Sequence, residues 1–329
     1  MLRLPQLQVA RPRTVEEALA LLGGEGALPF AGGTDLLPNL KHRLLAPQTL
    51  VSLAGVEGLS GVSVDPGGAL VIGATTRLHE VAEHPEVRAR APALAMAAGL
   101  VASPQIRRMG TLGGNVLLDT RCRYVNQSAF WRKSLGHCLK KDGAVCHVVP
   151  GGQKCVAAAS NDTAPALLTL GASLTVATAA GTREVPLESL WKPDGVYNRR
   201  LAPNELVTAI RVPAQAAGHR GAYLKLRPRE SFDFPLLGVA VRVDAAGGVV
   251  QSADVVVVAL QAVPRRVTGA SDELAGKALG TQELEAAIVA VGARAHQQCR
   301  PLPNVPGDPD YRREMVPVFV RRALRAAAG

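Results

Sequence analysis

Aromatic residues and long hydrophobic runs are scarce in this sequence. Phe, Trp and Tyr make up 3% of the 329 residues, so alanine, valine and leucine must fill the hydrophobic core. No apolar run approaches the roughly 20 residues that a membrane-spanning helix requires, and we expect no contact with a membrane. The first residues, Met1 to Pro5, lack the apolar stretch of a secretory signal, which favours a cytoplasmic location.

Several catalytic signatures are also missing. The chain contains no H-E-x-x-H motif, no Ser/His/Asp order and no paired-carboxylate spacing, so a hydrolase is not favoured. It has no G-x-G-x-x-G turn, which leaves a Rossmann fold without support. The formal net charge of +10 could indicate nucleic-acid binding. The basic residues are not interleaved with aromatic ones, however, and we expect no nucleic-acid partner.

Two glycine-rich motifs are the first positive signal. They are Pro29-Phe30-Ala31-Gly32-Gly33-Thr34-Asp35-Leu36 and Gly110-Thr111-Leu112-Gly113-Gly114-Asn115. The first motif follows a predicted strand and precedes a predicted short helix. Because glycine has no Cβ atom, such turns let successive N–H groups converge on an anionic ligand. From these residues alone, an ordinary turn and a ligand-binding turn both remain open.

Four of the five cysteines form the second signal, with the spacing C-x15-C-x7-C-x8-C over Cys122, Cys138, Cys146 and Cys155. Four thiolates can hold a tetrahedral zinc ion or an iron–sulfur cluster. The neighbouring His137 and His147 keep a mixed Cys/His zinc site open, and free buried thiols are a third alternative. Cys299 stands alone and is expected to be a core or surface thiol.

Basic residues are concentrated around these cysteines. Residues 120–158 carry seven lysines and arginines against one aspartate, a local net charge of +6. A solvated surface is one interpretation, and a docking surface for an acidic protein partner is the other. On the second interpretation, Lys140 and Lys141 would face the partner.

The pattern of hydrophobic residues predicts alternating helices and strands in three parts. A capping box at Thr14–Glu17 opens the first helix. We expect an α+β fold with residues 1–58 and 59–217 as two cofactor-binding subdomains, an insertion at about 120–158, and a C-terminal domain at 218–329. Predicted strands lie at 28–31, 50–53, 69–74, 172–177, 182–185, 206–212, 222–226, 237–243 and 249–260, and helices at 78–82, 93–100, 164–170, 282–298 and 311–327.

The two glycine motifs together with Asp162 resemble the FAD-binding medium subunit of the xanthine oxidase family of molybdenum enzymes, and the resemblance covers the whole chain. It implies a two-part FAD-binding domain of the vanillyl-alcohol-oxidase type, followed by a C-terminal domain of the CO-dehydrogenase flavoprotein type. It also implies partner subunits, one large with molybdopterin and one small with 2Fe–2S clusters, in a dimer of heterotrimers. By this resemblance the residues that contact FAD are those of the two glycine motifs with Asp162, Lys225, Val101 and Val207.

The interval from Asn115 to Asp162 is far longer than in most medium subunits. It is similar to an insertion in the beta subunit of 4-hydroxybenzoyl-CoA reductase, with matches at Asn126-Gln127-Ser128, Trp131 and Cys146-His147-Val148. This similarity implies that Cys122, Cys138, Cys146 and Cys155 bind a 4Fe–4S cluster. It further implies reductive dehydroxylation of 4-hydroxybenzoyl-CoA to benzoyl-CoA, driven by reduced ferredoxin, with the substrate bound in another subunit.

Three other functions remain open at this point. The chain could be the medium subunit of another molybdenum hydroxylase that runs oxidatively. It could be a self-contained flavin reductase that uses NAD(P)H, or a zinc-stapled structural subunit without a redox centre.

Overall fold

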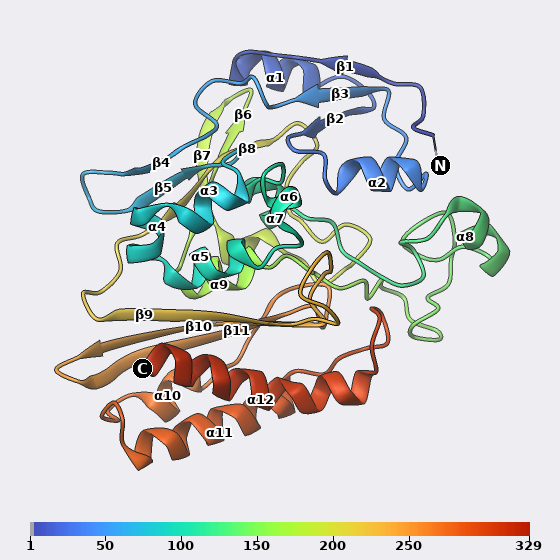
Figure 1. Cartoon of the computed structure of the whole chain (residues 1–329). Helices are drawn as coiled ribbons and strands as arrows, with labels where there is room; N and C mark the ends of the chain where they lie inside the picture. The colour runs from blue at the N-terminus through green and yellow to red at the C-terminus, as the bar shows by residue number, and fades with distance from the viewer. Residues whose placement is uncertain (1–2) are drawn as a thin grey trace.

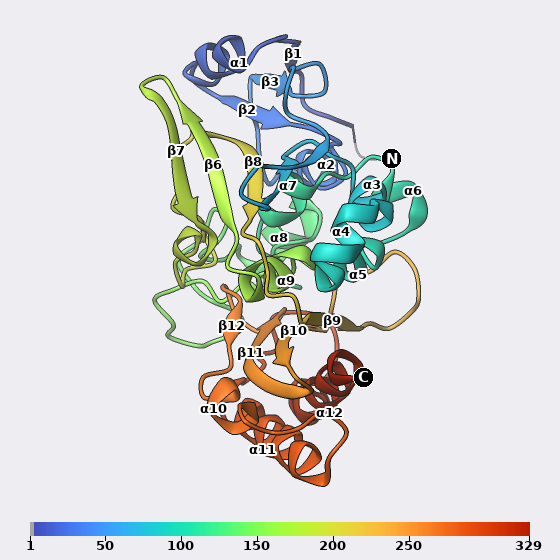
Figure 2. The ribbon, with the colours of Figure 1, turned by 90° about the vertical axis from the view of Figure 1, so that its left-hand side faces the viewer.

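The computed structural model describes residues 3–329 and contains three β-sheets that follow one another from the top to the bottom of Figure 1. A three-stranded parallel sheet comes first, a five-stranded antiparallel sheet is central, and a four-stranded antiparallel sheet comes last. Figure 2 shows the same succession from the side. None of the helices in this described range combines the length and the hydrophobicity that a bilayer crossing requires. The expected α+β fold is confirmed.

The N-terminal part is a small α/β unit with strand order β1-β3-β2. Thr14 caps the first helix, because its Oγ1 accepts a hydrogen bond from the N–H of Glu17 at 3.2 Å. The Glu17 carboxylate reaches back to the N–H of Arg13 at 2.7 Å, one residue before the expected position. The elements are β1 (Gln8–Ala10), α1 (Val15–Leu22), β2 (Ala27–Phe30), α2 (Leu36–Lys41) and β3 (Thr49–Ser52).

The central sheet has the order β4-β5-β8-β6-β7, and short helices cover it. Pro85, Pro92 and Pro104 each begin a helix, where the missing proline N–H leaves no donor unpaired. The elements are β4 (Val62–Val64), β5 (Leu70–Gly73), β6 (Ser173–Thr178), β7 (Gly181–Pro186), β8 (Leu206–Val212), α3 (Leu78–Glu83), α4 (Pro85–Arg90), α5 (Pro92–Gly99), α6 (Pro104–Arg107), α7 (Leu112–Val116), α9 (Thr163–Thr169) and the 3₁₀ helix η1 (Leu187–Leu190).

The last sheet has the order β12-β11-β10-β9 and is covered on both faces. Alternate residues of its strands belong to two hydrophobic cores. Val239 and Val241 pack with α11 and α12, whereas Ala240 and Tyr223 pack against the central part. This double burial explains the valine-rich runs that predicted these strands. The elements are β9 (His219–Leu226), β10 (Leu237–Ala246), β11 (Val249–Val258), β12 (Arg265–Arg266), α10 (Ala270–Leu274), α11 (Gln282–Gln298) and α12 (Pro309–Ala328).

The cysteine-rich segment stands out from this body as a separate lobe at the right of Figure 1. Its one helix is α8 (Ala129–Leu135), which Ser128 caps and which ends at Gly136 in the left-handed conformation, with φ of 89°. The buried Arg132 ties α8 to the N-terminal unit by donating to the carbonyl of His42 at 2.9 Å. The segment is therefore anchored to the body rather than free.

Candidate cofactor sites

A large cavity of about 800 Å³ lies between the N-terminal unit and the central part. Both glycine motifs contribute to its wall, although they are far apart in the sequence. The structure brings together these predicted residues: Pro29, Phe30, Ala31, Gly32, Gly33, Thr34, Asp35, Leu36, Val101, Gly110, Thr111, Gly113, Gly114, Asn115, Asp162 and Val207.

Two predicted residues lie behind this wall instead. Leu112 is fully buried in the central hydrophobic core. Lys225 supports a residue of the wall, because its Nζ donates to Asp162 Oδ2 at 3.1 Å. Both residues shape the cavity through their neighbours.

The two glycine motifs touch each other, and this contact requires glycine. A Cβ atom added to Gly32 would lie 1.8 Å from the carbonyl oxygen of Met109, the residue before the second motif. A Cβ atom on Gly113 would lie 2.8 Å from the carbonyl oxygen of Ala74. The second motif also differs from the expected turn, because Thr111 caps the short helix α7 that begins at Leu112. The absence of side chains here lets the backbone form the cavity wall.

The first motif presents several backbone donors to the cavity. Within residues 3–329, the N–H groups of Gly32, Gly33, Thr34 and Asp35 donate to no acceptor of the protein. Gly33 takes a positive φ of 68°, a left-handed conformation that glycine adopts readily. Such a set of free donors is suited to a phosphate group. The size of the cavity and this donor set therefore fit a dinucleotide such as FAD.

The carboxylate of Asp35 would repel an anion at this position, and Arg121 compensates for it. Arg121 forms an ion pair with Asp35 and lies over the ring of Phe234, with its Cζ 4.2 Å from the ring centroid. Burial lowers the pKa of Arg121 to about 10, so the guanidinium remains positive at neutral pH. Sequence reasoning did not find Arg121 or Phe234, because their pairing joins distant segments.

Asp162, a predicted FAD contact outside the two glycine motifs, is held in a buried hydrogen-bond network. Its Oδ1 accepts from the hydroxyl of Tyr223 at 2.7 Å, and the side chains of Asp162 and Lys225 are 3% and 1% exposed. Burial raises the pKa of Asp162, and the Lys225 ammonium and the Tyr223 hydroxyl oppose that rise. Tyr223 was missed, although it precedes Lys225 by two residues on β9 and so shares its face of the strand.

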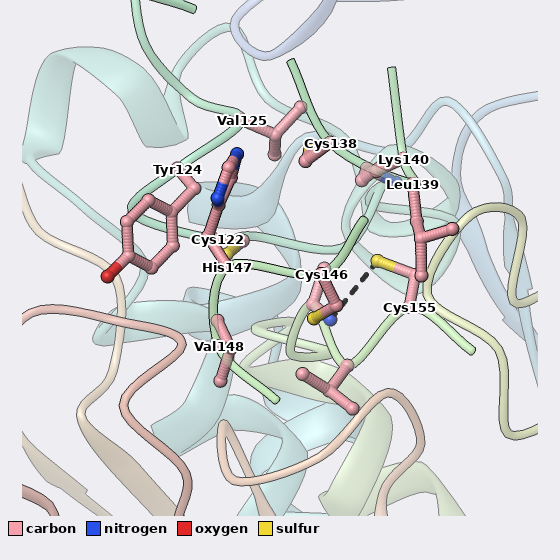
Figure 3. Close-up of a pocket in the computed structure, with 12 residues that line it drawn as sticks. Cys122, Tyr124, Val125, Cys138, Leu139, Lys140, Cys146, His147, Val148 and Cys155 are labelled. Atoms are coloured by element: carbon pink, nitrogen blue, oxygen red, sulfur yellow. Dashed lines mark hydrogen bonds between the residues drawn. The ribbon is translucent and has the colours of Figure 1, made fainter. Parts of the chain in front are cut away.

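A second, much smaller cavity of about 20 Å³ lies in the lobe (Figure 3). All four predicted cysteines, Cys122, Cys138, Cys146 and Cys155, line it. Two of the sulfur atoms already accept backbone hydrogen bonds at 3.4 Å, Cys146 Sγ from Val149 and Cys155 Sγ from Ala157. Such N–H donors favour a negatively charged sulfur. The fold thus gathers the four thiols of the sequence motif at one place.

The arrangement of these thiols bears on the kind of metal centre. Thiolates around one tetrahedral zinc ion, each about 2.3 Å from the metal, must lie within roughly 4 Å of one another. In the described part of the chain, no three Cys, His, Asp or Glu side chains converge closely enough to share a single ion. In a 4Fe–4S cluster each thiolate binds a different iron, which separates the sulfurs further. Four thiols around one cavity are a donor set that suits both a tetrahedral zinc ion and an iron–sulfur cluster.

Burial raises the pKa of the Cys155 thiol to about 11, with the Ala157 N–H and the Lys140 ammonium opposing the rise. Burial likewise raises the pKa of Cys122. Metal binding at these cysteines must therefore displace protons.

Cys299 is separate from the set: it lies in the C-terminal core, and burial raises its pKa to about 11. Of the two alternatives for this residue, the core thiol is correct.

The expected docking role of Lys140 is wrong. The Lys140 side chain is 7% exposed and pairs with Asp119, and Arg132 is also buried. Long-range contacts with the body of the protein remove these two charges from the surface. Arg123, Lys133 and Lys154 remain exposed on the lobe.

Two protein-family models match this chain. One, described as the FAD binding domain in molybdopterin dehydrogenase, matches residues 5–215. The other, described as the CO dehydrogenase flavoprotein C-terminal domain, matches residues 222–327. The chain belongs to the FAD-binding medium subunits of the xanthine oxidase family of molybdenum enzymes. The predicted succession of an FAD-binding domain and a CO-dehydrogenase-type C-terminal domain is thereby confirmed.

Individual relatives support the same conclusion along most of the chain. The carbon monoxide dehydrogenase medium chain of Hydrogenophaga pseudoflava is 32% identical over 98% of this chain and 97% of its own length. The nicotinate dehydrogenase FAD-subunit of Eubacterium barkeri is 26% identical over 89% of this chain and 88% of its own. A structure of the Hydrogenophaga pseudoflava carbon monoxide dehydrogenase, which lacks the Mo-pyranopterin moiety of the molybdenum cofactor, matches with a TM-score of 0.79 and 30% identity, covering 99% of this chain and 98% of that chain.

Proposed function

We propose that this medium subunit is an electron-transfer protein that holds FAD in the large cavity and a 4Fe–4S cluster between Cys122, Cys138, Cys146 and Cys155. The observation that carries the proposal is the gathering of four separated cysteines around one cavity of the lobe. A family member needs no such set for FAD alone, since the glycine motifs and Asp162 line the other cavity. The domain limits proposed with it are 1–58, 59–217 and 218–329.

Different residues of the large cavity are proposed to hold different parts of FAD. The free N–H groups of Gly32 to Asp35 are proposed to bind the diphosphate, and Arg121 to neutralise the adjacent Asp35. Asp162, kept in place by Tyr223 and Lys225, is proposed to orient the flavin by hydrogen bonding. FAD, when bound, supplies both one-electron and two-electron transfer. The cavity walls position it and exclude water.

The partners follow from the family and from the charge of the lobe. We propose a large molybdopterin subunit and a small 2Fe–2S subunit, assembled as a dimer of heterotrimers. Reduced ferredoxin is the proposed electron donor. Exposed Arg123, Lys133 and Lys154 would attract an acidic partner to the lobe, and the exposed Phe130 would give it an apolar contact. Electrons would then enter at the cysteines and leave through the flavin.

The reaction proposed for the complete enzyme is the reductive dehydroxylation of 4-hydroxybenzoyl-CoA to benzoyl-CoA. A second candidate is an oxidative molybdenum hydroxylase, which the similarity to carbon monoxide and nicotinate dehydrogenases favours. The substrate site lies outside this chain in both cases. The lobe with its cysteines is the feature that favours the first.

Turnover assays of the assembled complex should distinguish these two reactions. With reduced ferredoxin as donor we expect reduction of aromatic acyl-CoA esters, at a rate that falls as ionic strength rises, because salt screens the basic lobe. The same complex is tested with carbon monoxide, purines and N-heterocycles. Oxidation of one of these, without acyl-CoA reduction, would support the second candidate. A rate that does not change with salt would argue against the basic docking surface.

Metal and flavin analysis tests the proposed cofactors directly. Complex purified without oxygen should contain about four iron atoms in this subunit and about one FAD. Iron in the small subunit is removed from the count by separating the subunits before analysis. Zinc in place of iron would support the structural alternative, and rapid NAD(P)H oxidation by the isolated chain would support a self-contained reductase.

A further inference from the structure

Lys140 lies in the wall between the two cavities. It lines the cavity of the cysteines (Figure 3), whereas two of its partners, Asp119 and Val196, line the large cavity. Its side chain is 7% exposed. Its Nζ donates to Asp119 Oδ1 at 2.9 Å, Thr120 Oγ1 at 2.8 Å, Gly195 O at 2.7 Å and Val196 O at 3.3 Å.

The partners of Lys140 form one hydrogen-bonded unit that touches the cysteines. The hydroxyl of Thr120 donates to Gly195 O at 2.7 Å, and the N–H of Gly195 donates to Cys155 O at 2.8 Å. A Cβ atom on Gly195 would lie 3.0 Å from Cys155 Sγ, so the backbone packs directly against that sulfur. The ammonium is therefore held in a fixed place beside a proposed cluster ligand.

The charge of Lys140 is only partly balanced where it lies. Within residues 3–329 its one ionic partner is Asp119, whose side chain is 34% exposed and so is screened by water more than the ammonium is. Among the described residues that line the cysteine cavity, Lys140 alone is a lysine or an arginine. The Nζ itself donates to acceptors outside the cysteine cavity, and its positive charge acts on Cys155 across the backbone of Gly195, through a medium of low polarity.

We propose, on the basis of the cluster proposed above, that Lys140 is a positioning residue that raises the reduction potential of the cluster in the lobe. One-electron reduction of a cluster bound there would add a negative charge between the four thiolates. A fixed ammonium nearby stabilises the reduced form more than the oxidised form. The negative charge of Asp119 would lower the reduction potential of the cluster. Lys140 and Asp119 would thus together set the reduction potential of a cluster held by these cysteines.

The test is a redox titration of the cluster in the assembled complex, followed by its paramagnetic resonance signal. Lys140→Met should lower the equilibrium constant for reduction by about tenfold, which is ~59 mV for one electron. Asp119→Asn should shift the potential in the positive direction. Lys140→Arg retains the charge and should return the potential towards the wild-type value.

Lys141→Met is the matched control, because Lys141 is 32% exposed and pairs with Asp142 at the surface. The reduction potential of the cluster in this variant should equal that of the wild type. An unchanged potential in Lys140→Met overturns the proposal. Should Lys140→Met lose its iron, Asp119→Asn decides, since a positive shift supports the proposal and no shift overturns it. Wild-type protein without iron would instead contradict the cluster itself.

Discussion

Replacing Cys138 with serine should remove the iron of the proposed cluster and leave FAD bound. The hydroxyl of serine is a hard and weakly acidic ligand, whereas iron–sulfur clusters are held by thiolates. Cys138 lines the small cavity and does not line the large one. Its backbone is fixed independently of the sulfur, because its carbonyl accepts from the N–H of Lys141 at 2.8 Å and of Gly143 at 3.2 Å. The loop should therefore keep its shape.

Iron content and the visible absorption of the cluster measure the first effect, and flavin released by denaturation measures the second. We expect loss of most of the iron of this subunit with an FAD content equal to that of the wild type. Cys299→Ser is the matched control, because Cys299 is also a buried thiol but lies in the C-terminal core. Full iron content in Cys138→Ser, or equal iron loss in both variants, would contradict the assignment of Cys138 as a ligand.

Replacing Gly32 with alanine should strongly weaken FAD binding. The added Cβ atom would lie 1.8 Å from the carbonyl oxygen of Met109, which is backbone and cannot rotate away. The two glycine motifs must then separate, and overpacking of this kind costs about 1–3 kcal/mol or more. The free N–H groups of the first motif and the residues of the second motif line the same cavity. When the two motifs move apart, they can no longer contact FAD together. We expect FAD affinity to fall by at least about tenfold, which corresponds to about 1.4 kcal/mol.

FAD content after purification and the rise in melting temperature on addition of FAD measure this effect, because a ligand that binds only the folded state stabilises it. Gly55→Ala is the control. Gly55 is exposed, and its added Cβ would lie 3.8 Å from the nearest atom, Pro12 O, which is an ordinary contact. An FAD content in Gly32→Ala equal to that of Gly55→Ala would contradict the role of the first motif.

The local elements were largely predictable because their signals lie within a few residues. Thr14 caps α1 as expected, and the valine-rich runs became the strands of the last sheet. The segment 110–115 was predicted as a turn, yet Thr111 caps α7, which begins at Leu112, and Gly113 of this helix packs against Ala74. Strands as short as β1 and β4 carry too few residues for a periodic pattern and were missed.

The sequence could not predict the surroundings of Lys140, Arg121 and Tyr223. A lysine beside Lys141 in a basic segment is typical of a solvated surface, and only contacts with residues 119–120 and 195–196 bury it. Arg121 meets Asp35 and Phe234 across the fold. Each of these pairings joins segments that are distant in the chain, so no local pattern could indicate them.

The sequence by itself determined the chemistry of the two candidate sites. Glycines without Cβ atoms, four cysteines that can supply soft thiolates and one aspartate are properties of residue types and spacing. Only the tertiary structure decided how these parts meet: the contact of Gly32 with Met109, the gathering of the four cysteines, and the ammonium of Lys140 between the two cavities. The physical reason is that close approach and burial depend on long-range packing, which also decides whether a charge is screened by water or acts on its neighbours.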